Sequence, residues 1–299
     1  MLPFEGIILI DKPQDFTSFD VVAKMRGMAK TKKVGHAGTL DPMATGVLPI
    51  FFGRSTKAVD ILPNHDKAYR AKVKLGIVTD TQDITGKTIK TSDNIPTLEK
   101  VRETIKEFVG EQKQLPPMYS AVQVDGVRLY DLARQGIEVE RETRDIEIFS
   151  IEYICGEKDE FVIDVHCSKG SYIRTLCFDI GEKLGCGATL MELRRTMASG
   201  FKIEECITLE QAQKLTEEGN LQEKLIPLNK VFEHLPKITL SPKDTAHYLN
   251  GVRMTAKRFN VSISTGDIAI FDENETLLGI SYVDEKGFLR IKKQFVLIG

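Results

Sequence analysis

The sequence predicts an α+β fold, and three segments with clear periodicity support this prediction. Apolar and polar residues alternate over residues 69–75 and again over 161–167, which is the pattern of a strand with one buried face. Apolar residues then recur at helical spacing over residues 173–184. Because strands and helices are mixed along the chain without a regular strand–helix alternation, we expect an α+β arrangement.

The first expected elements are a buried strand and a helix. Residues 6–10 are mostly apolar and lead into Asp11-Lys12-Pro13, which is typical of a buried strand that ends at a turn. Ser18 is a suitable N-cap for a helix that continues to about Lys30. A loop is expected from about Thr31 to Gly46, and a loop of this length is usually functional or disordered.

Further elements follow in the middle of the chain. Tyr69 shares one face of its strand with Ala71, Val73 and Leu75, so we expect the Tyr69 side chain to point inward. Ser171 is a candidate N-cap for the helix after it. The remaining patterns indicate helices at 97–108 and 128–134, an extended segment at 121–124, a charged stretch at 138–145 and a strand at 190–196.

A second, smaller domain is expected after about Pro236. Short apolar segments broken by turn residues predict a small, mostly β domain there; they lie at 267–271, 279–283 and 288–291. We therefore divide the chain into residues 1–235 and 236–299, with residues 225–235 as the bridge between them.

The composition agrees with a cytoplasmic protein. The chain has 299 residues, enough for two domains and a sizeable core. It contains no apolar run as long as a membrane span, and its N-terminus does not have the pattern of a signal peptide. The five cysteines form no CxxC pair, so we expect buried free thiols and no metal site.

The segment Gly35–Pro49 is the most informative one, because it presents Asp41 in a glycine-rich turn. Glycine relaxes the steric limits on φ, and Pro42 pushes Asp41 toward an extended conformation. An Asp-Pro pair taken alone usually only initiates a turn. The segment also contains apolar residues that can be buried, which argues against disorder, so we interpret it as a shaped loop that presents a carboxylate.

This loop resembles the catalytic motif of the TruB family of tRNA pseudouridine synthases, which isomerise a uridine in the T-loop of tRNA. The resemblance keeps the family's order over most of residues 1–200, in the blocks Asp11-Lys12-Pro13 with Thr17-Ser18, Lys67-Ala68-Tyr69-Arg70 with Leu75-Gly76, Pro116–Val122, Lys169–Arg174 and Leu193-Arg194-Arg195. One departure is Asp15, which stands where the family usually has Gly. Aspartate tolerates left-handed backbone better than most residues, so we expect this turn to survive.

The resemblance implies an overall organisation. Residues 1–235 would form a pseudouridine synthase catalytic domain with a mixed or antiparallel sheet, and residues 236–299 a PUA-type RNA-binding domain. In the family, the region that corresponds to about 119–145 is a mobile lobe that helps to clamp RNA. The expected partner is the T-stem-loop of tRNA, with no cofactor and no obligate protein partner, and the protein is expected to be a monomer.

The resemblance also implies roles for individual residues. Asp41 would be the nucleophile, Tyr69 would lie close to the base, and Arg174 would form a salt bridge with Asp41. His36 would help to hold the displaced nucleotide, and the substrate pocket would also include Lys12, Tyr172 and Leu193. From the local sequence alone, an inward aromatic residue such as Tyr69 is equally well explained as part of the hydrophobic core. A lone loop histidine such as His36 is most often structural or solvated.

The chemistry explains why these residue types are needed. Pseudouridine formation breaks the bond from ribose C1′ to uracil N1 and rejoins the base through C5, which loses its proton. A carboxylate can act as nucleophile or stabilise positive charge on the sugar, and a guanidinium with two donors would keep it ionised in a dry site. Two points stay open: whether Asp41 attacks C1′ or C6, and whether Tyr69 stacks on uracil or assists loss of the C5 proton.

A run of basic residues leads into the loop, although the chain as a whole has a net charge of −2. Ten residues without an acid contain Lys24, Arg26, Lys30, Lys32 and Lys33. A solvated helix face is the simple explanation. Because the run lies next to the candidate site, we interpret Lys32 and Lys33 as phosphate contacts that bind RNA without reading its bases.

Two other functions must be weighed against this one. A nucleoside or glycoside hydrolase could use Asp41, but such enzymes usually pair two carboxylates, and no second acid lies in this loop. An RNA-binding or RNA-folding protein could keep the loop without activity. Free uracil as product would indicate hydrolysis, and release of tritium from uracil C5 would separate an isomerase from a binding protein.

Overall fold

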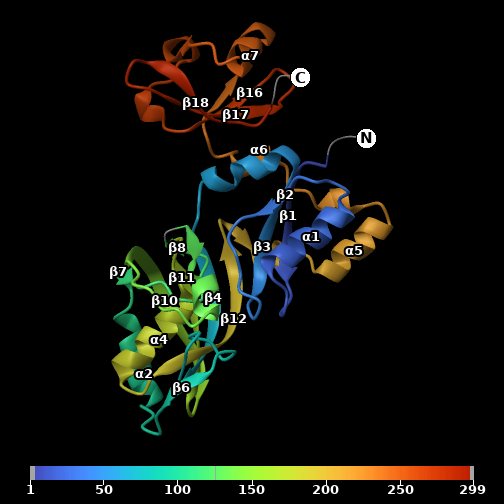
Figure 1. The fold of residues 1–299 in the computed structure, drawn as a ribbon. Coiled ribbons are helices and arrows are strands. Elements are labelled where there is room, and N and C mark those ends of the chain that lie inside the picture. The colour runs from blue at the N-terminus through green and yellow to red at the C-terminus, as the bar shows by residue number, and fades with distance from the viewer. Residues whose placement is uncertain (1–3, 125, 297–299) are drawn as a thin grey trace.

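The computed structural model describes residues 4–124 and 126–296, and its largest element is a nine-stranded sheet (Figure 1). The sheet has the order β1-β3-β12-β4-β11-β10-β7, with β2 added to β3 and β13 added to β12. All of its pairs are antiparallel except β12 with β3, which run parallel for two residue pairs. The mixed sheet, together with the helices packed on it, confirms the predicted α+β class.

The strands of this sheet are β1 (Gly6–Lys12), β2 (Val34–His36), β3 (Thr45–Phe52), β4 (Lys67–Leu75), β7 (Gly110–Gln114), β10 (Arg144–Glu157), β11 (Glu160–Cys167), β12 (Ala188–Ala198) and β13 (Phe201–Lys202). Two small hairpins join β5 (Ile77–Thr79) to β6 (Thr88–Thr91) and β8 (Gln123–Val124) to β9 (Val127–Arg128). The helices of this part are α1 (Ser18–Met28), α2 (Leu98–Lys106), α3 (Leu129–Arg134), α4 (Ile173–Leu184), α5 (Leu209–Glu217) and α6 (Leu228–Val231), with 3₁₀ helices η1 (Gly53–Ile61), η2 (Ile203–Glu205) and η3 (Leu221–Lys224).

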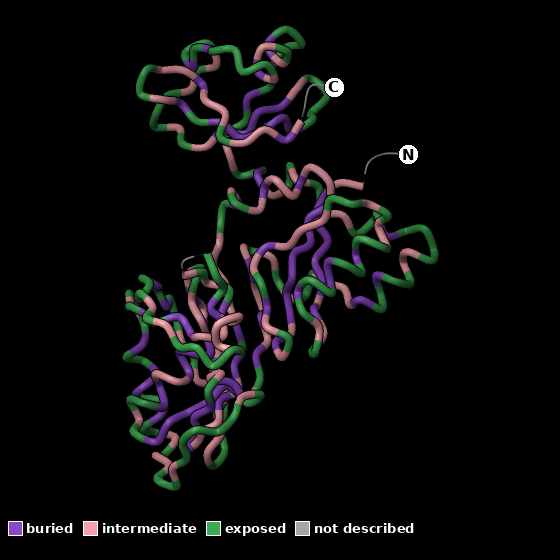
Figure 2. The backbone as a smooth tube through the Cα atoms, in the orientation of Figure 1, coloured by how far each residue is buried: buried purple, intermediate pink, exposed green. Residues whose placement is uncertain are grey.

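Two large hydrophobic cores pack helices against the sheet, and the buried stretches of the chain can be followed in Figure 2. One core packs α1 and α5 against β1 and β3, and the other packs α2 and α4 against β4, β11 and β12. Leu40 and Ala44 belong to the second core, although the chain reaches them from β2, which pairs with β3 in the first half of the sheet. The loop around Asp41 therefore lies where the two halves meet.

The C-terminal part forms a separate five-stranded sheet in the order β14-β16-β17-β18-β15 (Figure 1). Its elements are β14 (Lys237–Thr239), α7 (Pro242–Leu249), β15 (Met254–Thr255), η4 (Ala256–Phe259), η5 (Ile263–Thr265), β16 (Ile268–Phe271), β17 (Leu277–Val283) and β18 (Phe288–Gln294). This sheet has a hydrophobic core of its own, as expected for a small, mostly β unit. It contacts the first part at η1, where Lys57 Nζ donates to the carbonyl of Gln294 at 3.0 Å.

Both predicted N-caps are wrong by one residue. The cap of α1 is Thr17, because Thr17 and Asp20 form a reciprocal capping box, and the helix ends at Met28 before Lys30 takes a positive φ of 47°. The cap of α4 is Tyr172 instead of Ser171. The expected long loop also contains a short strand, β2, which adds to the edge of β3.

All five cysteines are unpaired, as expected, but Cys155 is exposed and Cys206 only partly buried, so burial of all five thiols was wrongly predicted.

Within the described residues, no helix combines the length and the apolar character that a membrane crossing requires.

Candidate active site

The backbone around Asp41 is fixed from several parts of the chain. Arg195 donates to the carbonyls of Gly38 at 2.9 Å and Thr39 at 3.3 Å. The Ser18 hydroxyl accepts from the N–H of Leu40 at 2.8 Å and donates to its carbonyl at 3.1 Å. Ser18 therefore anchors the loop and does not cap α1.

The residue after Asp41 is held in the same way. The carbonyl of Pro42 accepts from the N–H of Asp15 at 2.9 Å and from Lys12 Nζ at 3.2 Å. Asp15 has a φ of 64°, so aspartate does adopt the left-handed turn that was expected at this position. Lys12 is fully buried, and that burial lowers the pKa of its ammonium group to about 8.

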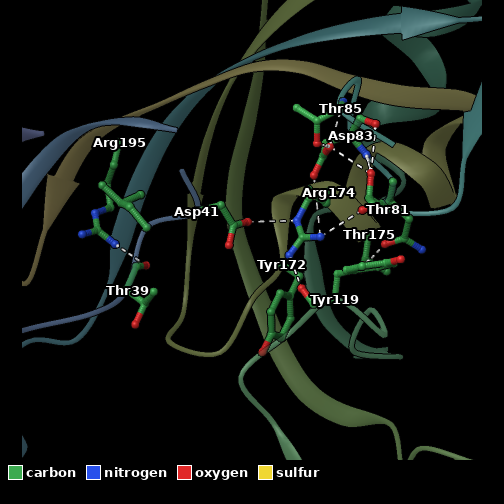
Figure 3. Close-up of polar contacts among 12 residues, drawn as sticks. Thr39, Asp41, Thr81, Asp83, Thr85, Tyr119, Tyr172, Arg174, Thr175 and Arg195 are labelled. Carbon is green, nitrogen blue, oxygen red and sulfur yellow. Dashed lines mark hydrogen bonds and ion pairs between the residues drawn. The ribbon is translucent and has the colours of Figure 1, made fainter. Parts of the chain in front are cut away.

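Asp41 forms an ion pair with Arg174, as the resemblance implied (Figure 3). Arg174 Nε lies 3.0 Å from Asp41 Oδ2. The other two nitrogens donate elsewhere, Nη1 to the carbonyl of Thr81 at 2.9 Å and Nη2 to that of Tyr119 at 2.7 Å. The expected contact through two donors is therefore wrong: one donor meets the carboxylate, and the other two hold the guanidinium in place.

A second carboxylate, Asp83, lies near another nitrogen of Arg174, and sequence reasoning missed it (Figure 3). Asp83 Oδ2 lies 3.8 Å from Arg174 Nη1. Asp83 Oδ1 accepts from the Thr81 hydroxyl at 2.9 Å and from the N–H of Thr85 at 3.0 Å. The closely spaced threonines around Asp83 were the available signal, because their hydroxyls fix this turn.

Tyr69 lies on β4, and its side chain is buried, with 6% of the residue exposed. Burial raises the pKa of the Tyr69 hydroxyl to about 12, while the positive charge of Arg195 opposes that increase. The phenol therefore remains protonated at neutral pH and can act as a hydrogen-bond donor.

These side chains surround a cavity of about 260 Å³. This volume is below the roughly 300–1,000 Å³ of pockets for drug-sized ligands, so it has room for a small group such as a single base. Of the residues predicted from the sequence, the cavity is lined by Asp41, Tyr69, Tyr172, Arg174 and Leu193. Among the described residues that line the cavity, Asp41 is the one with a carboxylate, and Asp83 is not part of the lining.

The other predicted residues lie outside this cavity. Lys12 lies under the loop, where its ammonium group also donates to the carbonyls of Pro13 and Phe16. His36 lies on β2 opposite Ile50 of β3, and burial lowers the pKa of its imidazole. Lys32 and Lys33 are exposed on the segment that leads into β2.

Arg195 is a further residue that the sequence did not single out. It is fully buried and donates to the carbonyl of Val47 at 2.8 Å as well as to the loop. Gly46 makes room for it: a Cβ on Gly46 would lie 2.1 Å from the Arg195 carbonyl oxygen. Arg195 thus links β12 to both ends of the loop.

The arrangement suits chemistry on a small electrophile or a developing cation. The described lining offers one carboxylate beside a buried guanidinium, and a protonated phenol in the same cavity. A carboxylate held in this way can attack carbon or stabilise positive charge. Hydrolysis by a pair of carboxylates is disfavoured, because Asp83 is buried and bonded within its own turn.

Comparison with known proteins matches most of the chain to one family. Residues 26–173 match the model of the TruB family pseudouridylate synthase N-terminal domain, and residues 174–233 match that of the tRNA pseudouridylate synthase B C-terminal domain. A Clostridium tetani protein named tRNA pseudouridine synthase B is 46% identical over 288 residues, covering 96% of this chain and 98% of the relative. A Bacillus subtilis protein of the same name is 41% identical and is matched over 96% of each chain.

A solved structure supports the fold. A chain of a Cbf5-Nop10-Gar1 complex is similar to this one with a TM-score of 0.71 and 27% identity, over 98% of this chain and 85% of that chain. Because this likeness covers nearly the whole chain, it includes the C-terminal sheet, which lies beyond the two family models.

Proposed function

This chain belongs to the TruB family of pseudouridylate synthases, as its motifs predicted, and from that premise we propose that it isomerises a uridine in the T-loop of tRNA, at position 55, to pseudouridine. The shared name of the curated relatives supports tRNA as the substrate. The T-loop position rests on the resemblance of the loop around Asp41 to the family's catalytic motif.

One observation carries the proposal: the Asp41 carboxylate meets the buried Arg174 guanidinium at 3.0 Å in a cavity that has room for one base. A guanidinium group is a permanent cation, so Arg174 can stabilise the negative charge of the carboxylate when substrate excludes water. Asp41 then acts as the nucleophile that detaches the base, and Tyr69 lies beside the base in the same cavity.

The reaction is an isomerisation: the C1′–N1 bond breaks, a C1′–C5 bond forms, C5 loses its proton and N1 takes one up from solvent, so no external group or electron carrier is consumed. The base must first leave its stack, which costs a few kcal/mol that contacts with RNA have to offset. In this proposal His36 helps to hold the displaced nucleotide. Lys12 fixes the loop through the carbonyl of Pro42, and Tyr172 and Leu193 line the cavity.

The remaining parts of the chain bind RNA in this proposal. Residues 1–235 form the catalytic domain, the segment 119–145 clamps the RNA, and residues 236–299 form a PUA-like RNA-binding domain. Lys32 and Lys33 are exposed next to the loop, where they can contact phosphates. We propose that the enzyme acts in the cytoplasm as a monomer, without a cofactor or an obligate protein partner.

Unmodified tRNA labelled with tritium at uracil C5 tests the function. We expect the wild-type enzyme to release tritium, and a transcript with cytidine at position 55 to release none above background. Free uracil with an abasic site would show a hydrolase instead. Binding of tRNA without any release of tritium would show an RNA-binding protein with an inactive site.

A further inference from the structure

Two cationic side chains line the active-site cavity within the described residues, and they differ in their partners. Arg174 uses all three of its nitrogens, on the carboxylate of Asp41 and on two backbone carbonyls. Lys67 is the second cation. In residues 4–124 and 126–296, its ammonium group has neither a carboxylate within 4.0 Å nor a hydrogen-bond acceptor, so Lys67 has a free charge at the site.

The strand and the loop direct Lys67 toward the site. Lys67 is the first residue of β4 and lies two positions before Tyr69, so both side chains project from the same face. Its side chain reaches over the loop before Asp41, because a Cβ built on Gly38 would lie 3.2 Å from Lys67 Cε. Gly38 has a φ of 82°, which also favours glycine at this point of close approach.

The surroundings of Lys67 are electrostatically unfavourable for a cation. Burial lowers the pKa of Lys67, and the positive charges of Arg195 and Lys169 lower it further, whereas Asp66 partly opposes them. Among the described residues, Arg195 has no carboxylate within 4.0 Å, and its guanidinium donates to the backbone carbonyls of Gly38, Thr39 and Val47. A desolvated cation among other cations is stabilised when an anion binds beside it.

We propose that the Lys67 ammonium group binds a backbone phosphate next to the nucleotide whose base enters the cavity. This inference rests on the proposed function, since it supplies the RNA. A flipped nucleotide remains joined to the strand by a phosphate on each side, so an anion necessarily approaches the cavity when the base enters. Lysine suits a phosphate contact because its ammonium group is a compact point charge that needs no planar partner.

A double-mutant cycle between protein and RNA tests this contact. Three T-stem-loops are needed: an unmodified RNA and two that carry a neutral methylphosphonate at the phosphate 5′ or 3′ of the target uridine. Their affinities for the wild-type enzyme, Lys67→Met and Lys67→Arg are measured by fluorescence anisotropy at one salt concentration. Lys67→Met keeps the length of the side chain and removes the charge, and Lys67→Arg keeps the charge.

Lys72→Met is the matched control. Lys72 lies on the same strand but on the opposite face, where its ammonium group pairs with Glu160 at 2.9 Å. This variant removes the same charge from the protein without touching the cavity. We expect it to bind all three RNAs as the wild-type enzyme does.

For Lys67→Met we expect about tenfold weaker binding of the unmodified RNA, the size expected for one charge-assisted hydrogen bond. One of the two methylphosphonate RNAs should bind the wild-type enzyme about tenfold more weakly and show no further loss with Lys67→Met. Lys67→Arg should restore most of the affinity for unmodified RNA. The wild-type data on the three RNAs remain informative even if Lys67→Met fails to fold.

An equal loss with Lys67→Met on all three RNAs would overturn the phosphate contact, as would a loss of turnover without any loss of affinity. Full affinity of the wild-type enzyme for both methylphosphonate RNAs would overturn it as well. These outcomes leave the proposed function intact if tritium is still released from tRNA. Absence of tritium release by the wild-type enzyme would instead contradict the proposed function.

Discussion

The loop that carries Asp41 is fixed along its whole backbone, whereas the segment over residues 119–145, which also borders the cavity, is held at few points. Consecutive carbonyls from Gly38 to Pro42 all accept hydrogen bonds, four of them from side chains that lie far away in sequence. In the described part of 119–145, only Ser120 and Leu129 are buried. Arg141, which donates to the carbonyl of Pro116 at 2.9 Å, provides one of its few tertiary bonds.

This difference assigns the two segments to different tasks. A catalytic carboxylate needs one fixed position, because small errors in placement reduce rates strongly. A segment that closes on a folded RNA must adapt its shape, and segments with few buried contacts are the ones that move at low cost. In the proposed function, the buried anchors therefore serve the chemistry, and the exposed segment serves binding.

Asp41→Asn should show the largest effect and would separate chemistry from binding. The change keeps the shape of the side chain and removes its charge, so we expect kcat to fall by about a thousandfold or more. Affinity for tRNA should stay within about threefold, because the exposed segments that bind RNA are unchanged. Tritium release and filter binding on the same samples check this; a parallel loss of binding would contradict the separation.

Arg174→Lys should come next, with a loss of about a hundredfold in kcat. A lysine can pair with Asp41 but cannot also hold the carbonyls of Thr81 and Tyr119, so the charge would lose its fixed position. Arg70→Lys is a suitable control, since Arg70 forms a two-donor pair with Asp164 on an exposed surface. Near-normal kcat in Arg174→Lys would remove Arg174 from the mechanism.

Ser18→Ala should test the loop anchor itself. The change leaves the N–H of Leu40 without its buried partner, which should cost about 1–2 kcal/mol of unfolding free energy. We also expect about tenfold lower kcat, because Asp41 follows Leu40 directly.

The control for this anchor is Ser241→Ala, which removes the N-cap of α7 in the C-terminal sheet. Loss of that cap should cost about 1 kcal/mol with no change in kcat. Thermal unfolding and single-turnover rates measure both effects. If both variants lower stability and neither changes kcat, the anchor serves folding alone.

Alanine at Lys32 and Lys33 should give the smallest effect, confined to binding. Each exposed charge that contacts a phosphate should contribute about 0.7–0.9 to the slope of log affinity against log salt concentration. We expect the slope to fall by that amount per residue with kcat unchanged. Lys100→Ala, an exposed change on α2, is the control. An unchanged slope after both substitutions would show that Lys32 and Lys33 are ordinary solvated side chains that do not contact phosphates.

Local patterns in the sequence predicted the elements but not the residues that meet at the site. The alternation over β4 and the helical stripe over α4 were enough to place Tyr69 inward and Arg174 near the start of a helix. The order of the sheet could not be predicted, because it depends on pairings between distant strands. The parallel contact of β12 with β3 brings Arg195 to the loop.

Arg194 and Arg195 show why such residues escape prediction. They are identical neighbours on one strand, so alternation places them on opposite faces without indicating which face is buried. In the structure, Arg194 pairs with Asp11 at 2.7 Å and is partly exposed, whereas Arg195 is fully buried. The position of Asp83 beside Arg174 was not predicted for a similar reason, because the tertiary fold brings its turn to Arg174.

Hydrogen exchange, measured with and without RNA, tests the contrast between the two segments most directly. In the free enzyme we expect slow exchange at the bonded amides of Leu40 and Ala44, and fast exchange over residues 126–145. Binding of a T-stem-loop to Asp41→Asn should slow exchange over 126–145 and leave Leu40 and Ala44 nearly unchanged. Fast exchange at the loop in the free enzyme, with protection gained there on binding, would contradict a pre-formed site for Asp41.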